Sequence, residues 1–562
     1  MESDRTGRPA IRDWALVAVI TAVAALLRFW LLGDKSLWGD EINMVRFAIG
    51  ERDMALSYGN AHGYICLLRA IAALGRSDAL FRAPAAVAGI ATVPLMYVMG
   101  KLVLGRGAGL VGALLLAVSP MHIALSQEVH GYALFALLSV LAFVLVWKAV
   151  TDGAWRYWTG SALVVGVSFY IHLYTAFLVC DLLVLFFILA LAERRLRRPR
   201  DLARVVLGRR PLLATGLALV MVAPIVWQTV WPLALDLARK LGGQPTLDGQ
   251  FEGEPRWDFS VGLFMRIVKE LLVWKVEPQS TFLVLLVLLL IGLIVLLARE
   301  RWKGALLLLW IGLPILPVAY FSWLSNLSFP SRRFVFVLPA CLLAIAGGIS
   351  SVGEAIRWIV GRATRVKVSA WAVDLVVAGA VATLVASTAL HSYYHVFEKQ
   401  DYRRLARFLE EQVRPGDAVV LWKADELYDY YYTGTVQLTT LFDRTQVTRI
   451  ARQYEGSERI WYVRPLSVRR RRANLEKIEQ WLEKKGALSF RFDPYTMVSF
   501  SRRAPLSEAA ERAERESILA AAIDLKPGRW YLHLDLATEY RRQGRLGKAR
   551  RELTIAHELR GR

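Results

Sequence analysis

The chain has 562 residues, of which 55% are hydrophobic, and its formal net charge at pH 7 is +22. Hydrophobic residues gather in runs of about 20, long enough to cross a hydrocarbon core of about 30 Å, which excludes a soluble globular protein. The positive charge does not indicate nucleic-acid binding, because no basic soluble face with interleaved aromatic residues stands apart from the membrane pattern.

These runs predict an α-helical polytopic membrane protein with about 11 transmembrane helices. The first run has no small-residue cleavage site after it, so we expect it to remain as an anchor and not to be removed as a signal peptide. The predicted spans are residues 14–32, 83–103, 108–125, 129–149, 157–171, 173–192, 211–231, 280–298, 304–323, 334–353 and 371–391.

Lys and Arg are distributed unequally between the two sets of loops. The loop 193–210 alone carries eight arginines, whereas the turns 126–131 and 170–175 carry no Lys or Arg. By the positive-inside rule, the N-terminus is cytoplasmic and the region after the last span is periplasmic or extracellular, as expected in a cell inner membrane. The basic loops then have anionic membrane lipids as their partner.

In this topology eight candidate site residues, all ionisable, lie in the outer loops and turns at one membrane level. They are Asp40, Glu41, His62, Glu128, His130, His172, Arg332 and Arg333.

Each of these residues also has a structural interpretation. Glu128 lies between two apolar spans, where an unpaired charge costs about 2.5–3.5 kcal/mol, so either a structural ion pair or a functional role would explain it. His172 could be a hydrogen-bonded interfacial histidine, and Arg332 and Arg333 could anchor the chain at the lipid surface. No spacing such as HExxH or paired CxxC occurs, so we do not expect a structural metal.

The outer loop 232–279 contains the polar, Gly-rich stretch 242–255, which is a candidate lid. The apolar residues that follow recur at helical spacing from Val261 to Leu271. They predict a helix that either lies flat on the outer interface or packs on the bundle.

We divide the chain into a membrane domain, residues 1–392, a small outer α/β domain, residues 393–503, and a helical tail, residues 504–562. Strands are predicted around 417–422, 457–466 and 497–502, with one helix before the first strand and one, at 474–486, between the second and the third. The tail resembles one tetratricopeptide (TPR) repeat, with Ala537, Tyr540, Gly544 and Ala549 at the characteristic places. One helical pair cannot bury its own apolar face, so we expect it to dock on the α/β domain or on a partner.

Five motifs occur in an order that carries a family resemblance: SLWGDE (36–41), FRAPAAVAG (81–89), SPMHIALSQEVHGY (119–132), YIHLY (170–174) and PSRRFVFVLP (330–339). The chain resembles the glycosyltransferase C superfamily, in the branch of protein O-mannosyltransferases and lipid A aminoarabinose transferases. The resemblance is strong over residues 14–180 and looser through the last motif. It implies a hexosyl or pentosyl transferase that takes a sugar from a polyprenyl-monophosphate donor at the outer face.

The resemblance also implies roles for individual residues. Asp40 matches the loop acid proposed as general base, beside Glu41, and Glu128 aligns with a second acid near the site. The residues matching positions near the lipid phosphate are His172, Tyr174, Arg332 and Arg333. The residues expected to line the site are Trp38, His62, Tyr64, Gln127, His130 and Tyr132. Relatives often have Arg in place of His130 and His-Pro-Pro in place of His62-Gly63-Tyr64.

These residue types suit the reaction on chemical grounds. A carboxylate can remove the acceptor proton as the new bond forms, and arginines suit the phosphate that departs in a single inverting displacement. A divalent cation, Mg²⁺ or Mn²⁺, could be recruited by Asp40 and Glu128. The alternatives are a polyprenyl-diphosphate glycan ligase or polymerase, a transporter or flippase, and an inactive scaffold. The sugar and the acceptor, whether glycan, lipid or protein, stay open.

Overall fold

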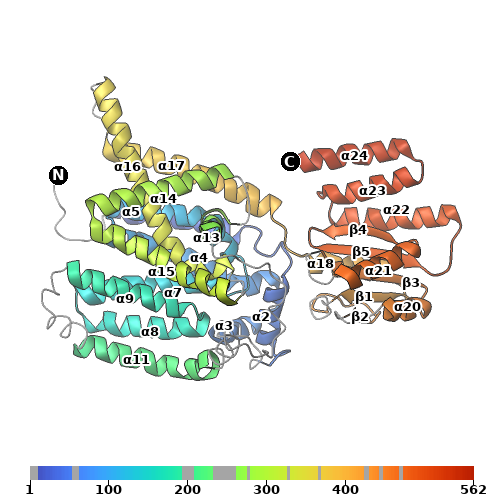
Figure 1. Ribbon diagram of the computed structural model, residues 1–562, viewed down its shortest axis with the longest axis horizontal. Helices are drawn as coiled ribbons and strands as arrows, with labels where there is room; N and C mark the ends of the chain where they lie inside the picture. The colour runs from blue at the N-terminus through green and yellow to red at the C-terminus, as the bar shows by residue number, and fades with distance from the viewer. Residues whose placement is uncertain are drawn as a thin grey trace. The chain divides into compact units, whose positions relative to one another are not determined.

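The computed structural model describes residues 11–53, 62–192, 208–231, 261–274, 279–325, 330–364, 369–422, 429–441, 447–466 and 472–561. The chain forms two compact units, coloured in Figure 1 by position along the sequence. The membrane unit comprises Met1–Gly33 and Met44–Phe397. The C-terminal unit comprises Glu398–Arg562 together with a short segment from near the N-terminus, Asp34–Asn43.

The membrane unit is helical, and each predicted apolar run coincides with a helix or a helix pair. Its helices are α1 (Ile11–Phe29), α2 (Gly39–Ile49, whose first residues belong to the C-terminal unit), α3 (His62–Ala72), α4 (Asp78–Val103), α5 (Arg106–Val118), α6 (Pro120–Ser126), α7 (Tyr132–Thr151), α8 (Trp155–Ile171), α9 (Thr175–Ala192), α11 (Arg209–Ile225), η2 (Val226–Val230), α13 (Val261–Val273), α14 (Gln279–Arg299), α15 (Arg301–Ser325), η4 (Ser331–Val337), α16 (Leu338–Thr364), α17 (Ala370–Thr388) and η5 (Ala389–Val396).

Among the described residues, eight helices are long and apolar enough to cross a membrane. The number is nine if α5 and α6, which meet at 57°, form one broken span. The bend follows from the sequence, because Ser119 has an extended backbone before Pro120 and its hydroxyl caps α6 by accepting from the His122 N–H. The chain is therefore a multi-pass membrane protein, while the count of 11 spans stays a prediction.

Helix α13 packs within the membrane unit. Its residues Ile267, Val268 and Leu271 are buried, and the helix contacts α6, α14 and η4. Of the two interpretations of this stretch, packing on the bundle is the one that the structure supports. The candidate lid 242–255 lies outside the described residues.

The C-terminal unit is built on a five-stranded sheet in the order β2-β1-β3-β5-β4. Strand β1 pairs in parallel with β2 and β3, and β5 pairs antiparallel with β3 and β4. The strands are β1 (Ala418–Trp422), β2 (Leu438–Leu441), β3 (Arg459–Pro465), β4 (Leu488–Asp493) and β5 (Thr496–Arg502). Three of them match the predicted strands, and the sequence interpretation missed β2 and β4.

Helices cover the sheet, and the C-terminal tail continues from its edge (Figure 1). Helices α20 (Val447–Glu455) and α21 (Arg472–Lys484) pack on one face, while Phe408 of α18 (Tyr402–Gln412) contacts Trp461, Phe490 and Phe492. The tail forms α22 (Glu508–Leu525), α23 (Trp530–Arg542) and α24 (Leu546–Gly561), and both α22 and α23 contact edge strand β4. Gly544 links α23 to α24 with a φ of 73°, a conformation that favours glycine.

Candidate functional site

The two adjacent acids of the first motif have different environments. Both lie in the first turn of α2, where the positive end of the helix dipole favours carboxylates. Glu41 is 1% exposed and accepts from Lys399 Nζ at 3.1 Å and from the Trp38 N–H at 3.2 Å. Asp40 is partly exposed. The structure therefore gives Glu41 a buried ion pair and leaves Asp40 as the accessible acid of the two.

Six residues of the predicted site lie together in the membrane unit: His130, Tyr132, His172, Tyr174, Arg332 and Arg333. We call them the aromatic–arginine cluster. The rings of His130 and Tyr132 stack with their centroids 3.9 Å apart, and the ring of His172 lies 5.4 Å from Tyr132 and 5.2 Å from Tyr174. Four elements supply the cluster: the turn before α7, the start of α7, the turn between α8 and α9, and η4.

Local hydrogen bonds fix these turns. The hydroxyl of Thr175, at the start of α9, donates to the His172 carbonyl at 2.6 Å, and the Tyr174 N–H donates to His172 Nδ1 at 3.2 Å. The short helix η4 begins after Pro330, where the hydroxyl of Ser331 donates to the carboxylate of Glu270 in α13. Turns held in this way present the cluster's side chains from a rigid frame.

The two arginines lie over the aromatic rings. The guanidinium carbon of Arg332 is 5.8 Å from the ring centroid of Tyr132, and that of Arg333 is 5.9 Å from the ring centroid of Tyr174. Burial first, and then the charges of Arg333 and Arg332, lower the pKa of His172 well below its usual value. His172 is therefore neutral at pH 7, and the cluster combines two cations with neutral hydrogen-bonding groups, a suitable setting for an anion.

The other predicted residues take different places. Glu128 is buried two residues before His130, whose N–H donates to the Glu128 carbonyl at 2.7 Å. Tyr64 is buried beside Gly131, and His62 is the partly buried first residue of α3. The side-chain amide of Gln127 donates to the carbonyls of Arg28 and Trp30 at 3.0 and 2.8 Å, which gives it a structural role at the end of α1.

Sequence reasoning missed several residues around these groups. Phe135 lies one helical turn after Tyr132, and its ring stacks on His172 with the centroids 5.1 Å apart. Phe334 follows the arginine pair, and its ring lies 5.4 Å from Tyr174. Helical spacing from Tyr132 could have identified Phe135, but no local signal pairs Lys399 with Glu41, 358 residues away.

No group of three or more His, Cys, Asp and Glu side chains suited to a metal ion occurs within the described part of the chain. Asp40 and Glu128, the expected ligands of a divalent cation, belong to different units.

Residues 63–227 match the family model described as dolichyl-phosphate-mannose-protein mannosyltransferase. Two proteins of Bacillus subtilis (strain 168) that are named as mannosyltransferases by inference, YkcB and YycA, are similar to this chain. YkcB is 29% identical to it over 107 residues, and YycA is 26% identical over 187 residues. These matches cover 19% and 32% of this chain but only 15% and 27% of the two relatives. The chain thus spans less than a third of the length of either curated relative.

Crystal structures of ArnT from Cupriavidus metallidurans are similar over most of the chain. The apo structure and the one bound to undecaprenyl phosphate are 13% and 14% identical, each with a TM-score of 0.52. Each comparison covers 87% of this chain and 98% of ArnT. At such low identity the likeness concerns the fold. The chain therefore has the fold of a glycosyltransferase C protein, of the type to which ArnT and the protein O-mannosyltransferases belong.

Proposed function

We propose that the protein is an integral-membrane glycosyltransferase that moves a sugar from a polyprenyl-monophosphate donor to an acceptor hydroxyl or amine at the outer face. The observation that carries this proposal is the aromatic–arginine cluster, where Arg332 and Arg333 lie over Tyr132 and Tyr174 beside a neutral His172. Planar guanidinium groups bind phosphate oxygens with paired hydrogen bonds. The undecaprenyl phosphate bound to ArnT, a protein of the same fold, agrees with this ligand chemistry.

In the proposed reaction, the acceptor oxygen or nitrogen attacks the anomeric carbon as the bond from that carbon to the phosphate oxygen breaks. The bonding electrons leave with the polyprenyl phosphate, whose added negative charge is stabilised by Arg332 and Arg333. Asp40 takes the proton of the acceptor, and the single displacement inverts the anomeric centre. Glu128 is the second acid of the site, whereas Glu41, in its buried ion pair, is not available as a base.

The orientation that the proposal needs follows from the Lys and Arg asymmetry of the loops. The N-terminus is cytoplasmic, and the C-terminal unit with Asp40 lies on the periplasmic or extracellular side.

The test is sugar release from a panel of radiolabelled polyprenyl-phosphate sugars by the purified protein. We expect turnover with one monophosphate donor, lowered about 10²- to 10⁴-fold in Asp40→Asn, which removes the base. Asp34→Asn is the matched control, because Asp34 is an exposed acid of the same segment, and it should keep full activity. An EDTA arm tests whether a divalent cation at Asp40 and Glu128 takes part.

Two results would contradict the proposal. Turnover with diphosphate-linked donors only would favour the glycan ligase or polymerase. Full turnover by a folded Asp40→Asn variant would move the base elsewhere, with Glu128→Gln as the next variant.

A further inference from the structure

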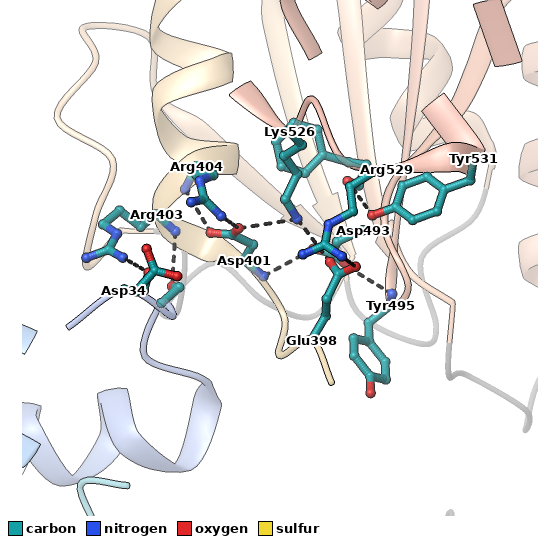
Figure 2. A network of polar contacts seen from close by, with 12 residues as sticks. Asp34, Glu398, Asp401, Arg403, Arg404, Asp493, Tyr495, Lys526, Arg529 and Tyr531 are labelled. Carbon is teal, nitrogen blue, oxygen red and sulfur yellow. Dashed lines mark hydrogen bonds and ion pairs between the residues drawn. The ribbon is translucent and has the colours of Figure 1, made fainter. Parts of the chain in front are cut away.

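The segment Asp34–Asn43, which carries Asp40, belongs to the C-terminal unit although about 350 residues of membrane unit separate the two in sequence. Backbone and side-chain groups of the segment form hydrogen bonds with the rest of that unit. The Leu37 N–H donates to the hydroxyl of Tyr431 at 3.0 Å, and the Arg403 N–H donates to Ser36 Oγ at 3.2 Å. The guanidinium of Arg403 also donates to the Asp34 carbonyl (Figure 2).

The ion pair between Glu41 and Lys399 is the most buried of these contacts. Its atoms are 3.1 Å apart, and the two side chains are 1% and 6% exposed. Glu41 is adjacent to Asp40 in the same helical turn, and it also accepts from the Trp38 N–H. Removing one partner of such a pair leaves a buried charge, so the pair strongly restricts where the turn can lie.

Residues next to Lys399 in the chain belong to a network of charged side chains (Figure 2). Glu398 pairs with Arg529 at 2.7 Å, and Lys526 lies 3.5 Å from Glu398 and 3.2 Å from Asp401. The Asp401 N–H donates to Asp493, at the end of β4, at 3.1 Å. The residues around Lys399 are therefore fixed by the sheet and by the connection from α22 to α23.

The charge of Asp40 acts on Tyr402 of α18. Burial raises the pKa of the Tyr402 hydroxyl, and the charges of Asp493 and then Asp40 raise it further, which places Asp40 close to the first residue of α18. The turn with Asp40 thus lies against residues 399–403 and Tyr431 of the C-terminal unit.

We infer that Lys399 is a positioning residue for Asp40: through Glu41, the C-terminal unit holds the first turn of α2 and so sets the position of the proposed general base. The catalytic consequence rests on the proposed function, whereas the structural consequence does not. The C-terminal unit is then needed for the reaction and is more than an appended domain.

The experiment is hydrogen–deuterium exchange of the full-length protein, read on peptides that cover residues 34–43. In Lys399→Met we expect at least tenfold faster exchange there, with the membrane helices unchanged. The control is Arg464→Met, because Arg464 forms an ion pair with Glu479 in the same unit, with side chains 13% and 35% exposed. The control should leave exchange at 34–43 as in the wild type.

Activity supplies the second readout. We expect kcat to fall at least tenfold in Lys399→Met with the donor KM within about twofold of wild type, and Lys399→Arg to retain most of kcat. The charge-exchanged variant Glu41→Lys with Lys399→Glu should recover part of the loss. Should Lys399→Met not fold, Tyr431→Phe is the milder variant, because it removes the hydroxyl that accepts from the Leu37 N–H and keeps the ring. It should raise exchange at residues 36–39.

Wild-type exchange at 34–43 in a folded Lys399→Met variant, or in Tyr431→Phe where the former does not fold, would overturn the inference. So would faster exchange with unchanged kcat. If the wild type turns over no monophosphate donor, the proposed function fails, while the exchange measurement still decides whether the C-terminal unit holds the segment.

Discussion

At the scale of single residues, the arginines of the cluster differ from ordinary outer-surface anchors by their neighbours. Each guanidinium lies about 6 Å from a tyrosine ring, at a cation–π distance. A lipid anchor would instead extend its charge along the membrane surface. Both guanidinium groups are therefore held among the rings of the cluster.

We expect Arg333→Ala to raise the donor KM by roughly 10- to 100-fold, because a hydrogen bond to a charged group contributes about 1.5–3 kcal/mol. Arg333→Lys should lose less, since the charge stays and only the paired geometry is lost. Steady-state kinetics with the identified donor measure both. Arg299→Lys is the control, because Arg299 forms an exposed pair with Glu354. An unchanged KM in Arg333→Ala would assign the phosphate to other residues.

Asp535 gives a prediction on pH in the C-terminal unit. Burial raises the pKa of its carboxyl from 3.8 to about 6, although the Arg491 N–H of edge strand β4 donates to it at 3.0 Å. A raised pKa means that folding favours the protonated acid, so this contribution to stability is complete below 3.8 and is lost as the pH rises through about 6.

Asp535→Asn keeps the acceptor for Arg491 without the charge. Its free energy of unfolding should therefore match that of the wild type near pH 4 and exceed it by up to about 3 kcal/mol at pH 7. Exchange of α23 amides across this pH range measures the difference. Asp524→Asn is the control, since Asp524 is exposed. A difference that does not change with pH would show that the Asp535 carboxyl titrates normally.

At the scale of elements, apolar runs predicted the positions of the membrane helices because a span must be continuous and hydrophobic whatever its neighbours are. The strands were harder to predict. Strand β2 has only four residues, and β4 has only six, in which apolar residues alternate with polar or charged ones. The stretch GDEINM appeared to be an outer loop, yet it begins α2, since acids favour the first turn of a helix.

Close packing of α14 against α16 gives a prediction at this scale. A Cβ on Gly292 would overlap the carbonyl oxygen of Ala344, and one on Gly348 would overlap that of Leu288. Small residues at such crossings let the helix backbones approach closely. We expect Gly292→Ala to destabilise the protein by about 1–3 kcal/mol by forcing the helices apart.

Gly379→Ala is the matched control, because nothing lies within 4 Å of a Cβ at this α17 position. It should leave stability unchanged or raise it slightly, as alanine is the better helix former. Thermal unfolding of the detergent-solubilised protein compares the two variants. Equal midpoints would show that α14 and α16 pack less closely than described.

At the scale of the whole molecule, motifs identified candidate site residues, but they could not predict which of these residues share an environment. The aromatic–arginine cluster follows from helix ends that the span pattern already locates, so most of it was predictable. The pairing of Glu41 with Lys399, and of the Asp40 segment with the C-terminal unit, depends on contacts across the full length of the chain. Local sequence holds no signal for such contacts, because any exposed Lys could be the partner.

Contacts between residues far apart in the sequence also join the C-terminal tail to the rest of the C-terminal unit. Lys526, between α22 and α23, is 2% exposed and pairs with Glu398 and Asp401. Burial acts to raise the pKa of Asp401, but Lys526 and Arg404 hold it below its usual value, so Asp401 stabilises the fold while it is charged. We expect Lys526→Met to lower the free energy of unfolding by about 3–5 kcal/mol at pH 7, because it removes a positive charge that pairs with buried carboxylates.

This loss of stability in Lys526→Met should become smaller as the pH falls below about 4, where protonation neutralises the carboxylates that have lost their partner. Lys548→Met is the control, because Lys548 is 53% exposed and lies 3.9 Å from Glu516, a surface pair worth at most about 1 kcal/mol. Amide exchange in β4 and in residues 34–43 of the full-length protein measures both effects. If exchange in Lys526→Met is faster in both places, the tail is connected through residues 398–401 to the segment that carries Asp40. If exchange is faster in β4 alone, Lys526 stabilises the sheet and does not act on that segment.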